Sequence, residues 1–320
     1  MEHDDRAESQ GGSDTLRQLP DTDLQVYPLA LGGSVFGWTA DGSTSYDILD
    51  RHHELGGNFV DTADSYAAGR SEVILGGWMR SRRTRDSTIV ATKIGRNLDN
   101  PGLAPRSIVG AVDASLERLQ TDRIDVLYFH LDDSDVPLEE SLGAVDVLVK
   151  CGKVRHLAAS NFSAERLMEA RVLAANGLPR FIALQSHYNL VHREAFESEL
   201  ALVTRAQGLG VMPYFALAHG FLTGKYRTKA DVVNTARGAR AAHYLHRRPL
   251  RVLSIMERIA AEHDAPLASV ALAWLLSRDG IVAPVASASS PSQVEGLMAA
   301  ARISLTRDDR HDLDKISAWA

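Results

Sequence analysis

This sequence of 320 residues has one cysteine, no long apolar run and no excess of positive charge. Cys151 cannot form an internal disulfide, so nothing indicates folding in an oxidising compartment, and we expect a cytoplasmic protein. The most apolar run, residues 269–276, is far shorter than the roughly 18 residues of a membrane-spanning helix, so we expect no membrane partner. The net charge of −6 argues against nucleic acid as a partner.

The composition divides the chain at about residue 15. Residues 1–14 are polar and acidic, and they hold too little apolar surface to offset the entropy cost of ordering, so we expect a disordered tail there. We expect residues 15–320 to form a single domain. It begins with two short segments, 15–19 and 24–29, separated by the turn-forming residues Pro-Asp-Thr-Asp, which predicts a β-hairpin.

Short apolar runs then alternate with longer segments of helical periodicity, which is typical of parallel βαβ units. Eight such runs are expected to be strands: 26–33, 58–62, 88–93, 124–130, 154–161, 181–186, 210–215 and 281–286. Eight alternating units predict a (β/α)8 barrel of the TIM type within the α/β class. The chain has further segments for a helix pair before the last strand, at 249–277, for a C-terminal helix, and for a long irregular loop at 227–249.

Polar side chains stand at the carboxyl ends of the expected strands, where a buried parallel strand is normally apolar. They are Asp61, Lys93, His130, Asn161 after Ser160, Gln185, Tyr214 and Ser287. Each one alone is more typical of a turn or a helix cap. In a barrel, however, they converge at the end where this fold carries its chemistry.

Three of these residues, together with Tyr66 on the loop after Asp61, suggest a proton donor. Lys93 in a barrel interior needs a carboxylate partner, and Asp61 is the natural one. We expect the ammonium to lower the pKa of the nearby Tyr66, and His130 to orient a carbonyl oxygen toward that tyrosine.

At this point the residues resemble those of the aldo-keto reductase superfamily over about residues 15–318. The resemblance rests on the motifs DTADSY at 61–66 with GRSE at 69–72, TKIG around Lys93, YFH around His130, SNF at 160, QSHYN at 185 and GFLTGKY at 220. It implies a catalytic set of Asp61, Tyr66, Lys93 and His130 and an extended nicotinamide dinucleotide, NADP(H) with NAD(H) as the alternative. The carboxamide would be held by Ser160, Asn161 and Gln185, and Tyr214 would stack on the nicotinamide. The pyrophosphate would follow Phe215, Ala216, Leu217, Gly220 and Leu222, and the adenosine phosphate would meet Ser287, Ser289, Ser290 and Gln293. Trp38, Tyr66 and His130 would line the pocket of a small-molecule carbonyl substrate.

The segment from Ser287 to Gln293 departs from the family pattern, because serines and a glutamine replace basic residues found in many users of NADPH. We therefore expect a modest preference for NADPH, with the loop residues Arg237, Arg240, Arg247 and Arg248 as a further source of positive charge. A metal site is not expected, since His52 and His53 are adjacent and no cysteine cluster exists.

Three functions remain open from the sequence. The first is NADPH-dependent reduction of an aldehyde, ketone or sugar carbonyl. The second is the reverse reaction, an NAD(P)+-dependent aldose or sugar-alcohol dehydrogenase. The third belongs to another class: relatives that serve as β subunits of potassium channels keep the barrel and these four residues but act through partner binding. The sequence sets neither the substrate nor the oligomeric state.

Overall fold

The computed structural model describes residues 15–319, and the expected tail at 1–14 lies outside the described residues. The first element is the predicted hairpin, in which β1 (Arg17–Gln18) pairs antiparallel with β2 (Gln25–Val26). Across its turn, the backbone N–H of Leu19 donates to the carbonyl of Leu24 at 2.9 Å. The hairpin prediction is confirmed.

Eight parallel strands form the central sheet, in the order β10-β3-β4-β5-β6-β7-β8-β9. Their bounds are β3 (Ala30–Gly32), β4 (Phe59–Asp61), β5 (Ile89–Ile94), β6 (Ile124–Phe129), β7 (Val154–Ser160), β8 (Phe181–Gln185), β9 (Gly210–Val211) and β10 (Val285–Ala286). Backbone hydrogen bonds from Val282 to Val211 (2.9 Å) and from Val285 to Pro213 (2.8 Å) join the two end strands. The predicted (β/α)8 barrel is confirmed.

Strands β9 and β10 have only two residues each, against runs of six. The run at 210–215 contains Pro213, and the run at 281–286 contains Pro284. Proline has no N–H to donate to a sheet ladder. Accordingly β9 ends at Val211 and β10 begins at Val285.

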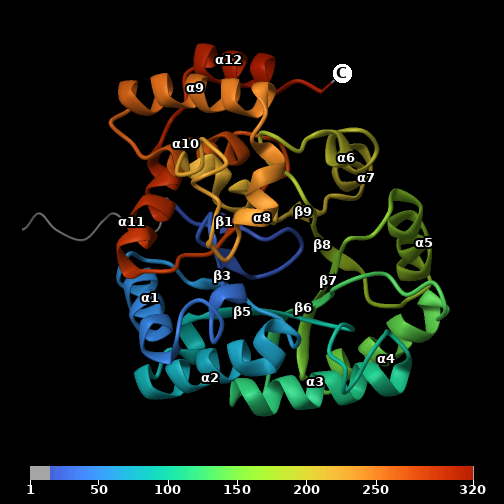
Figure 1. The fold of residues 1–320 in the computed structure, drawn as a ribbon. Helices are drawn as coiled ribbons and strands as arrows, with labels where there is room; N and C mark the ends of the chain where they lie inside the picture. Colours follow the sequence, from blue (N-terminus) through green and yellow to red (C-terminus); the bar gives the residue numbers. More distant parts are fainter. Residues whose placement is uncertain (1–14, 320) are drawn as a thin grey trace, which may run out of the picture.

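The helices surround the sheet, as Figure 1 shows. Their bounds are α1 (Gly42–Glu54), α2 (Arg70–Arg82), α3 (Pro105–Leu119), α4 (Leu138–Lys150), α5 (Ala164–Ala175), α6 (Glu194–Glu197), α7 (Leu200–Gln207), α8 (Gly238–Ala241), α9 (Arg247–Glu262), α10 (Leu267–Leu276), α11 (Pro291–Ala299) and α12 (Arg307–Ser317). The predicted extra helices are present: α9 and α10 precede β10, and the C-terminal α12 packs against α9. None of the helices within residues 15–319 has the length and apolar character needed to cross a membrane.

Local sequence explains where the helices begin. In α3, Pro105 occupies the first turn, where no N–H is needed, and Ile108, Val112 and Leu116 are buried on one face. The segment 227–249 is less irregular than expected, because it contains α8, the short 3-10 helix η5 (Ala242–Tyr244) and the start of α9.

The buried apolar residues form two layers. The larger layer lies between the sheet and the helices. The smaller fills the barrel, where Phe59 of β4, Val126 of β6 and Met212 just after β9 pack with Leu19 and Val26 of the hairpin. Because the hairpin packs at the amino end of the barrel, the carboxyl ends of the strands are left to form a cavity.

Candidate active site

A cavity of about 1350 Å³ lies at the carboxyl ends of the strands. The predicted site residues that line it are Trp38, Asp61, Tyr66, His130, Ser160, Asn161, Gln185, Tyr214, Phe215, Ala216, Leu217, Gly220, Ser287, Ser289 and Gln293. Residues separated by more than 250 positions in the sequence are thus brought to one site.

Three predicted residues do not line the cavity. Lys93 is buried beneath it, with 1% of its surface exposed. Leu222 lies in the 3-10 helix η4 (Ala218–Thr223), and its side chain is packed in the hydrophobic core. Ser290 is the residue before α11, and its hydroxyl lies 3.0 Å from that of Ser292. The side chains of Leu222 and Ser290 therefore do not line the cavity, because spacing along the chain does not fix the direction in which a loop side chain points, and their assignment to the cofactor-binding surface stays a prediction.

A buried ion pair lies under the cavity. Lys93, in β5, donates from Nζ to Asp61 Oδ2 at 2.6 Å and to the carbonyl of Thr62 at 2.8 Å. Gln185 at the end of β8 donates to the other oxygen, Asp61 Oδ1, at 2.9 Å. Burial disfavours the charged form of Lys93, but the charges of Asp61 and Tyr66 outweigh that effect and raise its pKa above the usual value. The ammonium is therefore held in its charged form.

Tyr66 and His130 lie above this pair. Tyr66 begins the 3-10 helix η2 (Tyr66–Gly69), and Lys93 Nζ lies 5.1 Å from the centre of its ring. The His130 ring meets the Tyr66 ring edge to face, with 5.9 Å between centres. Burial raises the pKa of Tyr66 above its usual value, and Lys93 offsets only part of this rise. The expectation of a net lowered pKa is wrong, because desolvation of the phenolate exceeds the attraction of one ammonium.

His130 is neutral. Burial, then the charges of Lys93 and Arg96, lower its pKa to about 2. Its Nδ1 atom is buried and has no hydrogen-bond partner among residues 15–319. A neutral imidazole that is not engaged by its surroundings can donate to, or accept from, a bound molecule.

The segment that carries Tyr66 has an unusual backbone. Ala67 and Ala68 both adopt left-handed conformations, with φ of 50° and 55°. Such angles cost roughly 1 kcal/mol for each non-glycine residue. They turn the chain sharply between Tyr66 and the start of α2.

Amide and hydroxyl groups line the next part of the cavity. Asn161 donates from Nδ2 to the carbonyl of His130 at 2.9 Å and to Ser160 Oγ at 3.0 Å, and Tyr214 donates its hydroxyl to Asn161 Oδ1 at 2.7 Å. These bonds fix the amide, and Tyr214, whose ring stacks on that of His187 with 5.5 Å between centres, is half-buried beside the cavity.

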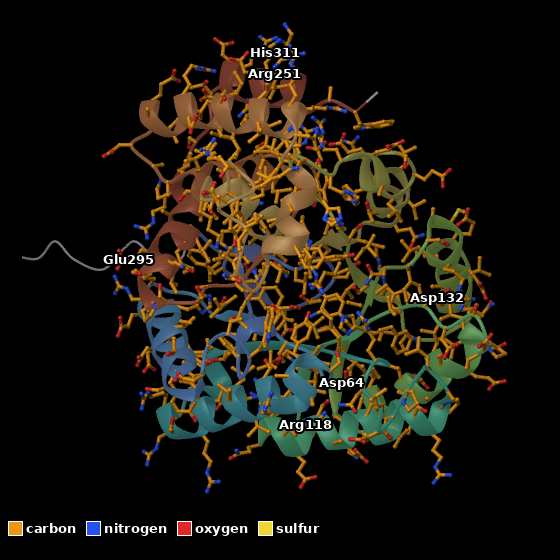
Figure 2. All side chains as sticks on the ribbon, viewed as in Figure 1. Asp64, Arg118, Asp132, Arg251, Glu295 and His311 are labelled. Carbon is orange, nitrogen blue, oxygen red and sulfur yellow. The ribbon has the colours of Figure 1, made fainter. Side chains whose placement is uncertain are left out.

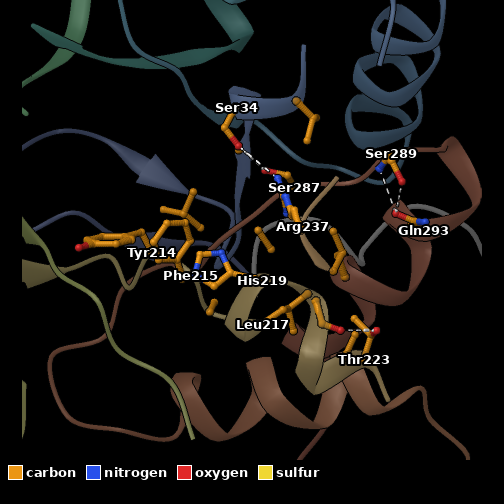
Figure 3. Close-up of a pocket in the computed structure, with 18 of the residues that line it drawn as sticks. Ser34, Tyr214, Phe215, Leu217, His219, Thr223, Arg237, Ser287, Ser289 and Gln293 are labelled. Atoms are coloured by element: carbon orange, nitrogen blue, oxygen red, sulfur yellow. Dashed lines mark hydrogen bonds between the residues drawn. The ribbon is translucent and has the colours of Figure 1, made fainter. Parts of the chain in front are cut away.

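The far end of the cavity carries hydroxyls and guanidinium groups, as Figure 3 shows. The hydroxyls of Ser34 and Ser287 lie 3.3 Å apart, and Arg237 reaches Ser34 Oγ at 3.5 Å. Gln293 accepts from the N–H of Ser289 at 2.9 Å. Arg237 is half-buried, and no ion pair within the described range 15–319 includes it.

The four loop arginines lie at two different places in the structure. Arg237 and Arg240 line the cavity, as expected. Arg247 and Arg248 begin α9 and line a separate cavity of about 790 Å³ between α9 and α12, so their expected contribution here is wrong. Because α9 starts at Arg247, two residues before Pro249, both arginines lie on this helix and not at the site.

A second buried acidic group lies below the site, next to α2 and α3 (Figure 2). Neither carboxylate oxygen of Asp64 has a hydrogen-bond partner within the described part of the chain. Burial, then the charge of Glu72, raises its pKa to about 7, against the opposing charge of Arg118. Glu72 itself accepts from Thr92 at 2.5 Å and from Arg118 at 2.7 Å.

Sequence reasoning missed many residues of the cavity wall, among them Arg96, Leu131 and His219. Arg96 and Leu131 follow predicted strand-end residues by three positions and one position, so a search of the whole loop after each strand would have found them. Among residues 15–319, no three His, Cys, Asp or Glu side chains are grouped so as to hold a metal ion.

Comparison with known proteins decides the family. The model of the aldo/keto reductase family matches residues 28–318. The chain belongs to the aldo/keto reductase family. Aldo/keto reductases are oxidoreductases that act on small molecules and generally use nicotinamide cofactors.

Three relatives illustrate the similarity of this aldo/keto reductase to fungal enzymes. It is 33% identical to norsolorinic acid reductase B of Aspergillus parasiticus, over 92% of this chain and 81% of the relative. It is 30% identical to an aldo-keto reductase of Alternaria alternata, over 93% and 90%. It is 29% identical to an aryl-alcohol dehydrogenase of Pestalotiopsis microspora, over 92% and 79%.

Proposed function

We propose that this aldo/keto reductase reduces an aldehyde or ketone with NADPH and that Tyr66 gives the proton to the carbonyl oxygen. The observation that carries the proposal is the buried Lys93–Asp61 pair directly below Tyr66, with neutral His130 at the edge of the same ring. This arrangement provides a proton and a fixed positive charge at one point of the cavity.

The cavity fits a nicotinamide dinucleotide. Two observations support the fit: amide and hydroxyl groups of Ser160, Asn161 and Tyr214 line the cavity, and Arg237, which also lines it, has no carboxylate partner among residues 15–319. Ser160, Asn161 and Gln185 would hold the carboxamide, Tyr214 would stack on its ring, and Ser287, Ser289 and Gln293 would lie at the adenosine end. When bound, the reduced dinucleotide supplies the hydride.

The chain's own residues move the proton. At neutral pH Tyr66 is protonated, because burial raises its pKa, so its hydroxyl can donate to a carbonyl oxygen. As that proton leaves, the ammonium of Lys93 stabilises the phenolate, and Asp61 keeps Lys93 charged. His130, which is neutral, hydrogen-bonds the same carbonyl oxygen and orients it toward Tyr66.

The preference for NADPH rests on positive charge at the adenosine end. Ser287, Ser289 and Gln293 offer only neutral groups, whereas Arg237 brings a guanidinium without a carboxylate partner in residues 15–319. Charge-assisted bonds to phosphate are roughly twice as strong as neutral ones. One half-buried arginine therefore supports a modest preference.

The reverse reaction is the second candidate. The relatives include a protein named as a reductase and another named as an aryl-alcohol dehydrogenase, and the same residues serve both directions. In the oxidative direction Tyr66 accepts the proton instead of donating it, since a catalyst accelerates a reaction both ways.

The test is the Tyr66→Phe variant, assayed with an aldehyde panel and NADPH. We expect turnover to fall by about 10² to 10⁴ while the Kd for NADPH changes little, because only the proton donor is lost. Tyr46→Phe, on α1 and outside the cavity, is the matched control. An undiminished rate of single-turnover reduction in Tyr66→Phe would exclude Tyr66 as the donor.

A further inference from the structure

Arg96 is a charged group of the cavity for which the proposed reaction has no use. It lies two residues beyond the end of β5 and lines the cavity together with Tyr66 and His130. It is exposed, and none of the ion pairs formed within residues 15–319 includes it. Asp132, on the loop after the paired strand β6, is occupied by Arg166 through two bonds of 2.8 Å.

The positive charge of Arg96 reaches the groups around the reacting position. After burial and Lys93, it is the next cause of the low pKa of His130, and it also lowers the pKa of Tyr66 and Tyr214 against the effect of their burial. Three side chains of the site thus lie within its field.

Apolar surface adjoins this cation. Trp38, with 54% of its surface exposed, and Leu131, with 42% exposed, line the same cavity. Large apolar side chains that remain this exposed in a concave site provide contact area for a flat, apolar molecule.

The cofactor does not account for Arg96. The groups suited to phosphates, the Ser287 hydroxyl and the Arg237 guanidinium, cluster around Ser34 (Figure 3), and no hydrogen bond of that cluster includes Arg96. The protein as a whole carries a net charge of −6, which repels anions at long range. A cation without a partner in this cavity therefore marks one place where an anionic group is favoured.

We infer that Arg96 binds a carboxylate on the substrate and that the preferred substrates are aromatic aldehydes or ketones carrying such a group, with the aromatic ring against Trp38 and Leu131. This inference rests on the proposed function, because it concerns the carbonyl substrate of the same site. A carboxylate and a guanidinium form charge-assisted, often bidentate, hydrogen bonds.

The experiment compares 3- and 4-formylbenzoate with their methyl esters, which keep the ring and the aldehyde but lose the charge. Oxidation of NADPH gives kcat/KM for each compound. In the wild-type protein we expect at least one acid to be preferred over its ester by about tenfold, which corresponds to one charge-assisted hydrogen bond. In Arg96→Met this ratio falls to about one, mainly through KM, and Arg96→Lys keeps part of it.

Arg70→Met is the matched control, since Arg70 is an exposed arginine at the start of α2 that does not line the cavity. It should keep the wild-type ratio. A measurement on the wild-type protein alone gives an independent check: raising the salt concentration should weaken the preference for the acid.

Two results overturn the inference while carbonyl reduction stands: equal kcat/KM for acid and ester in the wild type, or an acid preference that survives in Arg96→Met. If none of the aldehydes is reduced, the proposed function fails instead. Calorimetric binding of benzoate and methyl benzoate to the wild type and Arg96→Met then decides the role of Arg96, and equal affinities refute it.

Discussion

Asp64 makes the stability of this protein depend on pH in a direction opposite to that of an ordinary ion-paired carboxylate. Its pKa is raised from about 3.8 to about 7, so the folded state binds the proton more tightly than the unfolded state does. Ionisation of Asp64 therefore lowers the free energy of unfolding. This loss of stability is absent below about pH 4, grows as the pH rises, and is complete above about pH 7. A shift of this size corresponds to about 4 kcal/mol in total, of which about 2 to 3 kcal/mol accrues between pH 5 and pH 8.

The perturbation is Asp64→Asn, which keeps the shape of the side chain and removes its titration. The free energy of unfolding, measured by urea denaturation at pH 5, 6.5 and 8, should fall by about 2 to 3 kcal/mol more in the wild type than in the variant. Because buried His52 and His130 titrate in both proteins, the difference between the two curves isolates Asp64.

The control is Asp99→Asn, because Asp99 is exposed on the loop after β5. Its stability curve should run parallel to that of the wild type. Parallel curves for Asp64→Asn and the wild type would refute the reasoning, since they would mean that Asp64 is ionised in the folded protein at the same pH as in the unfolded chain.

Three other predictions follow from the packing and charges. Arg237→Met should weaken NADPH binding about tenfold, and NADH binding less, because a charge-assisted contact to phosphate is lost. Fluorescence titration at two salt concentrations measures both affinities, and an equal loss for the two cofactors would contradict the assignment. Gly76→Ala should cost about 1 to 3 kcal/mol in thermal or urea unfolding, because its Cβ would lie 2.5 Å from the backbone of α3, whereas Gly143→Ala, with nothing within 4 Å, should gain about 0.5 to 1 kcal/mol. Arg118→Met should cost about 3 kcal/mol in the same assay, because it leaves the buried Glu72 carboxylate with the Thr92 hydroxyl but no cation, and adding Glu72→Gln should recover part of the loss.

The sequence was most informative where periodicity and polarity act together. The alternation of apolar runs and helical segments predicted the barrel, because each parallel strand must be buried on both faces and each helix must cover it. The polar residue at the end of each run then predicted which side chains meet, because a barrel brings the carboxyl ends of its strands to one place. The order of the strands and the position of Tyr66 above Lys93 follow from the same logic.

What could not be predicted depends on the direction of single side chains and on the balance of opposing energies. Leu222 and Ser290 lie in segments that border the cavity, but only the packed structure shows that neither side chain lines it: Leu222 is in the hydrophobic core, and the hydroxyl of Ser290 lies beside that of Ser292. For Tyr66, the sequence indicates the ammonium nearby but not the degree of burial, and the burial sets the net direction of the pKa shift. The start of α9 was placed too late because proline is accepted throughout the first turn of a helix.

The two left-handed alanines after Tyr66 lower the stability of the folded protein but restrict the conformations of the loop. Glycine at Ala67 or Ala68 would adopt the observed backbone angles without steric cost, so the folded chain gives up free energy by carrying a methyl group there. The same methyl groups remove many of the other conformations that a glycine pair could adopt, in the unfolded chain above all. Replacing either alanine by glycine would therefore relieve the backbone strain of the folded protein. The same replacement would let the neighbouring Tyr66 adopt more positions, most of them unsuited to the site.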